Sequence, residues 1–122
     1  MPPADPESAF RDLVVADGAA RAVLRAEHAA RLCEGHFPGD PFVPGALLAG
    51  LMADLAAPLV ARDARLVEVV RCVFRARVVP DERIVLTARI ASVAPHETRI
   101  EAEVRAHGRA AARATLRFAH GR

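Results

Sequence analysis

The sequence predicts an α+β domain in which an antiparallel sheet wraps around one long central helix. Two features of the 122 residues predict this class. Residues 99–106 and 110–119 alternate between apolar and polar, which is typical of strands with one dry face and one wet face. Residues 45–57 are almost entirely apolar, which is typical of a helix that is covered on every side. A sheet with one dry face can cover such a helix by curling around it.

The length fits a single domain with one hydrophobic core. Residues 1–9 are rich in proline and are expected to form a flexible tail, and residues 10–122 are expected to form the domain. Hydrophobic residues make up 52% of the chain, and Trp and Tyr are absent. A core built from small side chains, together with an exposed sheet edge, favours a dimer.

Charge and composition exclude several classes of function. The 17 basic and 15 acidic residues are mixed along the chain and leave a net charge of only +2. Aromatic residues do not interleave with the arginines as base stacking requires, so nucleic acid is not an expected partner. Scattered arginines can instead steer association with an acidic protein. Residues 42–61 are interrupted by Pro44, Asp54 and Pro58, so no membrane span is expected.

The two cysteines indicate the compartment. Cys33 and Cys72 form no CxxC pair and have no metal-ligand spacing to histidine, so no metal site is expected. The first ten residues lack the basic and then apolar pattern of a secretion signal. We therefore expect reduced, buried thiols in a cytoplasmic protein.

A hairpin is expected to begin the fold. Asp17-Gly18 lies between two strand-like runs, and Asp-Gly is a strong signal for a two-residue hairpin turn. The strands on either side are expected at residues 13–16 and 20–27. A segment rich in proline and glycine then leads into a helix from about Gly45 to Ala57. Pro58 should end or kink this helix, because proline lacks a backbone donor.

Four further strands are expected to complete the sheet. Residues 65–77 suit a mostly buried strand, and residues 83–93 suit the next one. The last two strands are expected to be joined by a turn at His107-Gly108. Their core-facing residues are expected to be Ile100, Ala102, Val104, Ala106, Ala112, Ala114, Leu116 and Phe118.

The segment before the helix combines a histidine with a stiff backbone. Residues 36–50 read HFPGDPFVPGALLAG, and the three prolines limit backbone freedom around His36, so its imidazole can be held at little entropic cost. Gly45 stands where the helix begins and has no side chain to keep a ligand from the backbone. Amides at a helix start lack intrahelical acceptors, so they can polarise a thioester carbonyl and acidify the neighbouring carbon. A neutral His36 can then remove a proton from that carbon.

At these residues the chain resembles the β-hydroxyacyl-acyl carrier protein dehydratases of the FabZ and FabA type, which have the hotdog fold. The resemblance is carried by GHFPGDPFVPG at residues 35–45 and FRARVVPDERI at residues 74–84. It implies a dimer that removes water from a 3-hydroxyacyl thioester on acyl carrier protein, in fatty acid or polyketide-type biosynthesis, without a cofactor. It implies His36 as the base and the Gly45 amide as the carbonyl donor. The residues expected to bind substrate are Phe37, Phe42, Val43, Pro44 and Gly50.

One position departs from the family pattern. The resemblance implies a helix carboxylate, contributed by the partner chain, that protonates the departing hydroxyl, and its position here is Gly50. Asp54 lies one turn further on the same face, and its side chain leans back toward Gly50. Four residues rise about 6 Å and an Asp carboxyl reaches roughly 2.5 Å, which leaves about 3 Å for a bridging water. We expect apolar surroundings to raise the pKa of Asp54, which would suit a displaced acid.

Two alternative functions stay open. In the first, the chain is a non-catalytic hotdog subunit, which binds acyl chains or pairs with an active homologue. In the second, it is a hotdog acyl thioesterase in which water is the nucleophile. Gly50 also has two explanations, which are close helix packing and a pocket widened for a bulky acyl chain.

Other residues near the motif are given ordinary roles. Asp40 is expected in a turn and Phe74 in the core. His28 is expected at the surface. Arg75 and Arg77 are expected on the wet face of a strand, with phosphopantetheine or an acidic carrier surface as their alternative contact.

Overall fold

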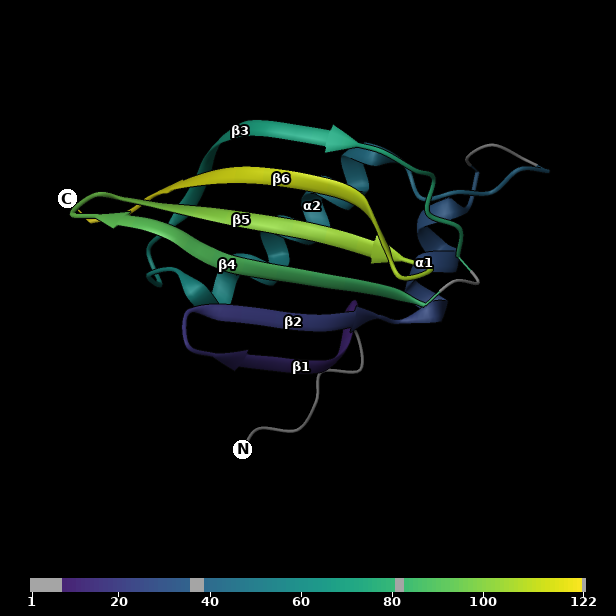
Figure 1. Cartoon of the computed structure of the whole chain (residues 1–122), viewed down its shortest axis with the longest axis horizontal. Helices are drawn as coiled ribbons and strands as arrows, with labels where there is room; N and C mark the ends of the chain where they lie inside the picture. The colour runs from purple at the N-terminus through teal and green to yellow at the C-terminus, as the bar shows by residue number, and fades with distance from the viewer. Residues whose placement is uncertain (1–7, 36–38, 81–82, 122) are drawn as a thin grey trace.

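The computed structural model describes residues 8–35, 39–80 and 83–121. The elements follow in the order β1 (Phe10–Ala16), β2 (Ala19–Leu24), α1 (Ala26–Cys33), α2 (Gly45–Ala56), the 3-10 turn η1 (Ala57–Leu59), β3 (Arg65–Phe74), β4 (Ile84–Ala94), β5 (Glu97–Ala106) and β6 (Arg109–Ala119). The strands form one antiparallel sheet in the order β1-β2-β4-β5-β6-β3 (Figure 1). The expected α+β architecture is confirmed.

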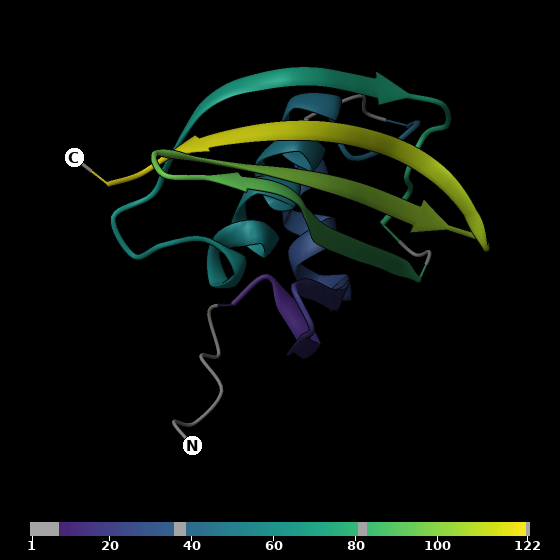
Figure 2. The same ribbon diagram turned by 60° about the vertical axis from the view of Figure 1, so that its left-hand side comes forward.

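The sheet bends around α2. Figure 2 shows the strands curving over one side of this helix, which contacts every strand from β2 to β6. The helix buries Leu48, Leu51, Met52, Leu55 and Ala56. All eight residues expected to face the core from β5 and β6 are buried, so the alternation in the sequence predicted this face correctly.

Both predicted hairpin turns are present. Asp17-Gly18 joins β1 to β2, and His107-Gly108 joins β5 to β6. In each turn both central residues have positive φ, between 51° and 73°. Two successive positive φ values are the signature of the type I′ turn, whose twist matches that of the flanking strands.

The central helix begins and ends close to the predicted residues. It ends at Ala56, and Pro58 lies in η1, where the helix tightens. The prediction that the helix is covered on every side is wrong for the single chain. Gly50 and Asp54 are exposed on one face of α2, because the sheet curves over the opposite side only.

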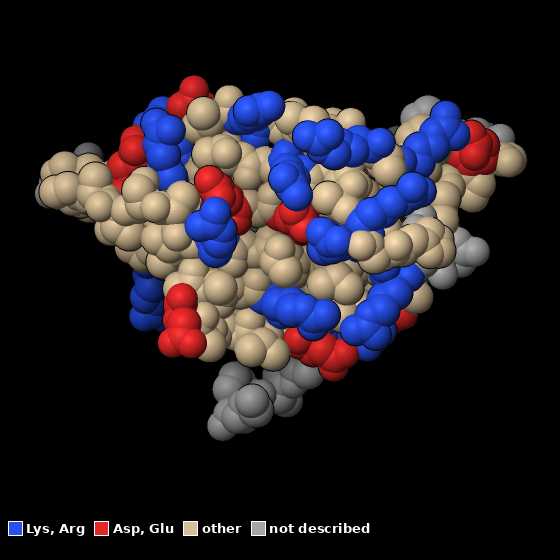
Figure 3. Space-filling view, viewed as in Figure 1, with Lys and Arg blue, Asp and Glu red and all other residues tan. Residues whose placement is uncertain are grey.

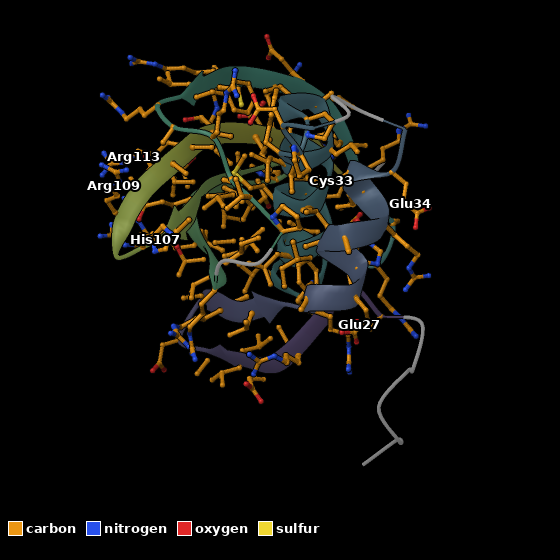
Figure 4. All side chains as sticks on the ribbon, turned by 90° about the vertical axis from the view of Figure 1, so that its right-hand side faces the viewer. Glu27, Cys33, Glu34, His107, Arg109 and Arg113 are labelled. Atoms are coloured by element: carbon orange, nitrogen blue, oxygen red, sulfur yellow. The ribbon has the colours of Figure 1, made fainter. Side chains whose placement is uncertain are left out.

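A short helix replaces the end of the second predicted strand. The strand expected to reach residue 27 ends at Leu24, because α1 begins at Ala26. Ala29 and Cys33 are the buried residues of α1, and they lie one turn apart on one face of this helix. Figure 4 shows Cys33 pointing inward from α1, while Glu27 and Glu34 point away from the rest of the molecule.

The strand expected to be mostly buried is mostly exposed. β3 forms one edge of the sheet, beside β6 alone. Five of its apolar residues are each at least 40% exposed, namely Leu66, Val67, Val69, Val70 and Phe74. The expectation that Phe74 belongs to the core is therefore wrong for the single chain. An apolar edge strand of this kind is a surface on which another chain can add.

Candidate active site

The first turn of α2 presents free backbone donors. Pro44 caps the helix, and its carbonyl accepts hydrogen bonds from the amides of Leu47 (3.0 Å) and Leu48 (3.1 Å). The amides of Gly45 and Ala46 precede these and have no backbone acceptor among the described residues. An oxygen atom that approaches this end of the helix would meet two aligned N–H groups at the positive end of the helix dipole.

The chain leading into α2 is anchored to the segment that follows β3. The amide of Val43 donates to the carbonyl of Val78 at 2.7 Å, and both side chains are buried. This hydrogen bond fixes the position of the helix start relative to the end of β3. Val43 therefore belongs to the core as well as to the expected substrate-binding set.

The ring of Phe74 lies directly over Gly45. A Cβ atom added at Gly45 would stand 3.0 to 3.2 Å from three ring carbons, which is closer than ordinary carbon contact. An alanine at this position would therefore force the Phe74 ring to shift by a few tenths of an ångström. Phe74 was not expected near the site, since it is 29 positions further along the chain.

A hollow of about 470 Å³ opens at this point, which we call the α2 cavity. Its lining residues are Phe42, Val43, Gly45, Leu48, Phe74, Arg75, Ala76 and Arg77. The volume is within the range of small-molecule sites, and the walls are apolar on the helix side and basic on the strand side. Three of the predicted site residues, Phe42, Val43 and Gly45, are thus brought together.

Arg77 holds one wall of the α2 cavity in place. Its guanidinium lies 4.4 Å from the centroid of the Phe42 ring and forms an ion pair with Asp40. A stacked cation of this kind restrains the aromatic ring. Asp40, expected in a turn, therefore also ties the approach to α2 to the end of β3. Arg75 has no side-chain partner among the described residues and lines the same cavity.

Three of the described residues that were predicted for the site do not line the α2 cavity, namely Pro44, Gly50 and Asp54. Gly50 is exposed, and a Cβ there would meet none of the described residues within 4 Å, so packing against that part of the chain does not require the glycine. Asp54 follows Gly45 by nine residues, or about 13 Å along the helix axis. Asp54 therefore does not act beside the Gly45 amide of its own chain. An Asp54 carboxyl can lie beside the Gly45 amide only if it belongs to a second chain.

The pKa of Asp54 is raised, as expected. Desolvation by burial raises it, and the charge of His28 on α1 opposes this effect. His28 is half-buried rather than solvated, and its Nδ1 atom is buried without a hydrogen-bond partner among the described residues. The surface role expected for His28 is therefore wrong. The missed signal is α1 itself, which carries His28 toward Asp54.

His36 and Phe37 lie outside the described residues, so their roles stay predictions. Cys33 and Cys72 are both free, and burial raises the pKa of each thiol, which disfavours the thiolate that a nucleophile needs. Within the described ranges, no group of three or more His, Cys, Asp or Glu residues could hold a metal ion.

The family of the chain follows from its sequence. A family described as ApeI-like, with ApeI dehydratase as its type, matches residues 14–114. The chain belongs to the ApeI-like dehydratase family. The resemblance to hotdog dehydratases drawn from residues 35–45 and 74–84 is thereby confirmed. No curated protein sequence matches this ApeI-like chain.

Solved structures confirm the hotdog fold. The dehydratase heterocomplex ApeI:P from Xenorhabdus doucetiae is 15% identical, with a TM-score of 0.67 over 95% of this chain and 93% of that one. A Streptococcus mutans protein bound to acetyl CoA is 13% identical, with a TM-score of 0.75 over 98% and 94%. A Thermus thermophilus thioesterase complexed with coenzyme A and zinc is 12% identical, with a TM-score of 0.60 over 66% and 67%.

In the part of the ApeI-like chain that the structure describes, no helix is both long and apolar enough to cross a membrane.

Proposed function

We propose that this ApeI-like chain eliminates water from 3-hydroxyacyl thioesters carried by acyl carrier protein, in fatty acid or polyketide-type biosynthesis. The observation that supports this most strongly is the α2 cavity, which is lined by Phe42, Phe74 and Gly45, whose amide has no backbone acceptor among the described residues. An acyl thioester fits such a site, because its carbonyl needs donors and its chain needs apolar walls.

The proposed reaction uses an acid and a base and needs no cofactor. The Gly45 amide donates to the thioester carbonyl, so electron density can move onto its oxygen when the α proton leaves. His36 takes that proton, the bond between the β carbon and the hydroxyl breaks, and an acid protonates the departing hydroxyl to give water. A double bond forms between the α and β carbons. Phe42, Val43 and Pro44, with Phe37, would hold the acyl chain.

We propose that the working unit is a dimer joined along β3. The apolar side chains of this edge strand are exposed in the single chain, and pairing with a second β3 would cover them. Phe74 belongs both to this edge and to the α2 cavity, so the site lies where the second chain would arrive. The free thiols agree with work in the cytoplasm, where thiols stay reduced.

In the homodimer, Asp54 of one chain would serve as the acid for the α2 cavity of the other. Its raised pKa keeps more of the carboxyl protonated than an Asp with an ordinary pKa would be. Gly50 leaves open space beside it in which a water or an acyl chain could lie. The Asp54 carboxyl would then reach the leaving hydroxyl through that water.

A second candidate function is a subunit that completes its site with a different hotdog chain. The ApeI:P structure is a heterocomplex of dehydratase subunits, and this chain has Gly50 where the family pattern has a carboxylate. In such a pair this chain would supply His36 and the Gly45 amide, and the other chain would supply the acid.

Mass spectrometry of a 3-hydroxyacyl-carrier protein distinguishes these functions. The purified chain should cause loss of one water, and Asp54→Asn should slow this loss. If water is lost only when a second dehydratase-like chain is added, the heterodimer is correct. Cleavage of the thioester would instead indicate a thioesterase and overturn the proposal.

A further inference from the structure

The outer face of the sheet, turned away from α2, carries a groove of about 770 Å³. Figure 3 views this face and shows more basic than acidic side chains over the strands. The groove crosses the sheet from β1 to β3, and the α2 cavity lies near its β3 end, since Arg75 lines both. The proposed dehydratase function makes no use of this groove.

Strand register explains how the groove forms. The inward alanines Ala20, Ala88, Ala102 and Ala114 are aligned across β2, β4, β5 and β6, so only their backbone forms the floor on the outer face. One row of outward side chains borders this floor on each side. The first row contains Val14, Arg21, Thr87, Glu103, Arg113 and Val73. The second contains Ala16, Ala19, Arg89, Glu101, Thr115 and Arg71.

The groove has a net positive charge that is concentrated at its ends. Five arginines and two glutamates line it. Both glutamates are neutralised near the middle, since Glu101 pairs with Arg89 and Glu103 pairs with Arg113 at 2.8 Å. The arginines at the two ends, Arg21 on β2 and Arg71 on β3, have no side-chain hydrogen bond or ion pair within the described parts of the chain.

The dimensions of the groove select the shape of its ligand. The two rows stand two residues apart along each strand, or about 7 Å, which admits an extended chain but not a helix of 10–12 Å diameter. Arg21 and Arg71 are separated by four strand spacings, or about 20 Å. An extended peptide covers this distance in about six residues. Of the residues that the structure describes, none that lines the groove is aromatic, so base stacking would have no platform.

We propose that the groove binds an extended acidic segment of a partner protein. Carboxylates six residues apart would meet the free guanidiniums of Arg21 and Arg71, and small residues between them would lie over the backbone floor. The segment would cross the strands on the face opposite to α2, so it and an acyl thioester could be bound together. The proposal is independent of the reaction that the α2 cavity carries out.

Nuclear magnetic resonance titration of the full-length ¹⁵N-labelled chain tests the proposal. The probe is a capped heptapeptide, Glu-Ala-Thr-Ala-Thr-Ala-Glu, with two comparison peptides that carry Gln at both ends or two adjacent Glu residues. The spaced acidic peptide should shift amides of β4, β5 and β6 saturably and bind about tenfold more tightly than either comparison. Its affinity should fall as salt is raised.

Variants decide whether the named arginines are responsible. Arg21→Ala and Arg71→Ala should each weaken binding of the spaced peptide about tenfold, with unchanged circular dichroism. Arg109→Ala is the matched control, because Arg109 is exposed on β6 outside the groove (Figure 4) and should change the affinity less than twofold. Equal affinity for the three peptides, equal effects of the three variants, or tighter binding of a single-stranded oligonucleotide would overturn the proposal.

Discussion

Replacing Gly45 by alanine should separate the stability of this protein from its activity. The added Cβ would stand 3.0 Å from the nearest carbon of Phe74, so the ring must move by about 0.5 Å to restore ordinary contact. Phe74 is 49% exposed at the sheet edge, so it can move without disturbing the core. We expect the free energy of unfolding to change by less than about 1 kcal/mol, because strain and the better helix propensity of alanine oppose each other.

The effect of Gly45→Ala on catalysis should be much larger. The methyl group and the displaced Phe74 ring both occupy the space beside the Gly45 amide, where the thioester carbonyl is proposed to bind. Loss of one such donor typically lowers kcat by about 10²- to 10³-fold, or roughly 2.7–4 kcal/mol in transition-state stabilisation. Since this exceeds the expected change in stability, partial unfolding would not explain it.

Paired assays measure the two effects. Dehydration of a 3-hydroxyacyl-carrier substrate gives kcat/KM, and urea unfolding gives the free energy of unfolding. Adding Phe74→Leu to Gly45→Ala removes the ring contact but keeps the methyl group, so the strain at residue 45 should be relieved while activity stays low. A Gly45→Ala protein with kcat/KM within twofold of the parent would refute the role of this amide.

Three further predictions concern the carboxyl, the core and the sheet edge. Asp54→Asn should raise the free energy of unfolding at neutral pH, because burial raises the pKa of Asp54 and ionisation of the carboxyl then penalises the folded state. This gain in stability should vanish below the ordinary pKa of 3.8. Urea unfolding at both pH values measures the gain, and a gain that grew on acidification would contradict the prediction. Met52→Ala should cost about 2–5 kcal/mol in urea unfolding, since Met52 is 0% exposed, whereas Val93→Ala, at a 66% exposed site, should cost less than about 0.5 kcal/mol. Val67→Lys should weaken dimerisation at least tenfold in sedimentation equilibrium, and an equal effect of Val93→Lys would argue against a seam along β3.

The sequence predicted the fold well where local rules decide it. Residues 100–106 and 112–118 alternate, and a shift by one residue would turn every apolar side chain to the wet face, so the pattern leaves one choice. Asp17-Gly18 likewise suits one kind of turn. The helix α1 was missed because its first residues, Ala26 and Glu27, were assigned to the end of the preceding strand, and a helix of eight residues is short. β3 was predicted to be buried because apolar content does not tell which strand ends up at an edge.

The candidate site was predictable only in part. Gly45 could be found because proline before it and an apolar run after it mark a helix start. Two contacts of the site were not predicted, that of the Phe74 ring with Gly45 and that of the Arg77 guanidinium with the Phe42 ring. Both depend on the path that β3 and the residues after it take past the helix. His28 beside Asp54 was missed together with α1. The exposure of Asp54 in the single chain could not be read from a helix whose other residues are apolar.

The central claim is that an acyl thioester binds with its carbonyl against the first amide of α2. A crystal structure of the protein with a 3-hydroxyacyl pantetheine amide, in which nitrogen replaces the thioester sulfur, tests it most directly. We expect the acyl carbonyl oxygen about 2.9 Å from the Gly45 nitrogen, and the His36 imidazole within reach of the α carbon. An acyl group bound away from the α2 cavity, or an imidazole of His36 turned into solvent, would contradict the account.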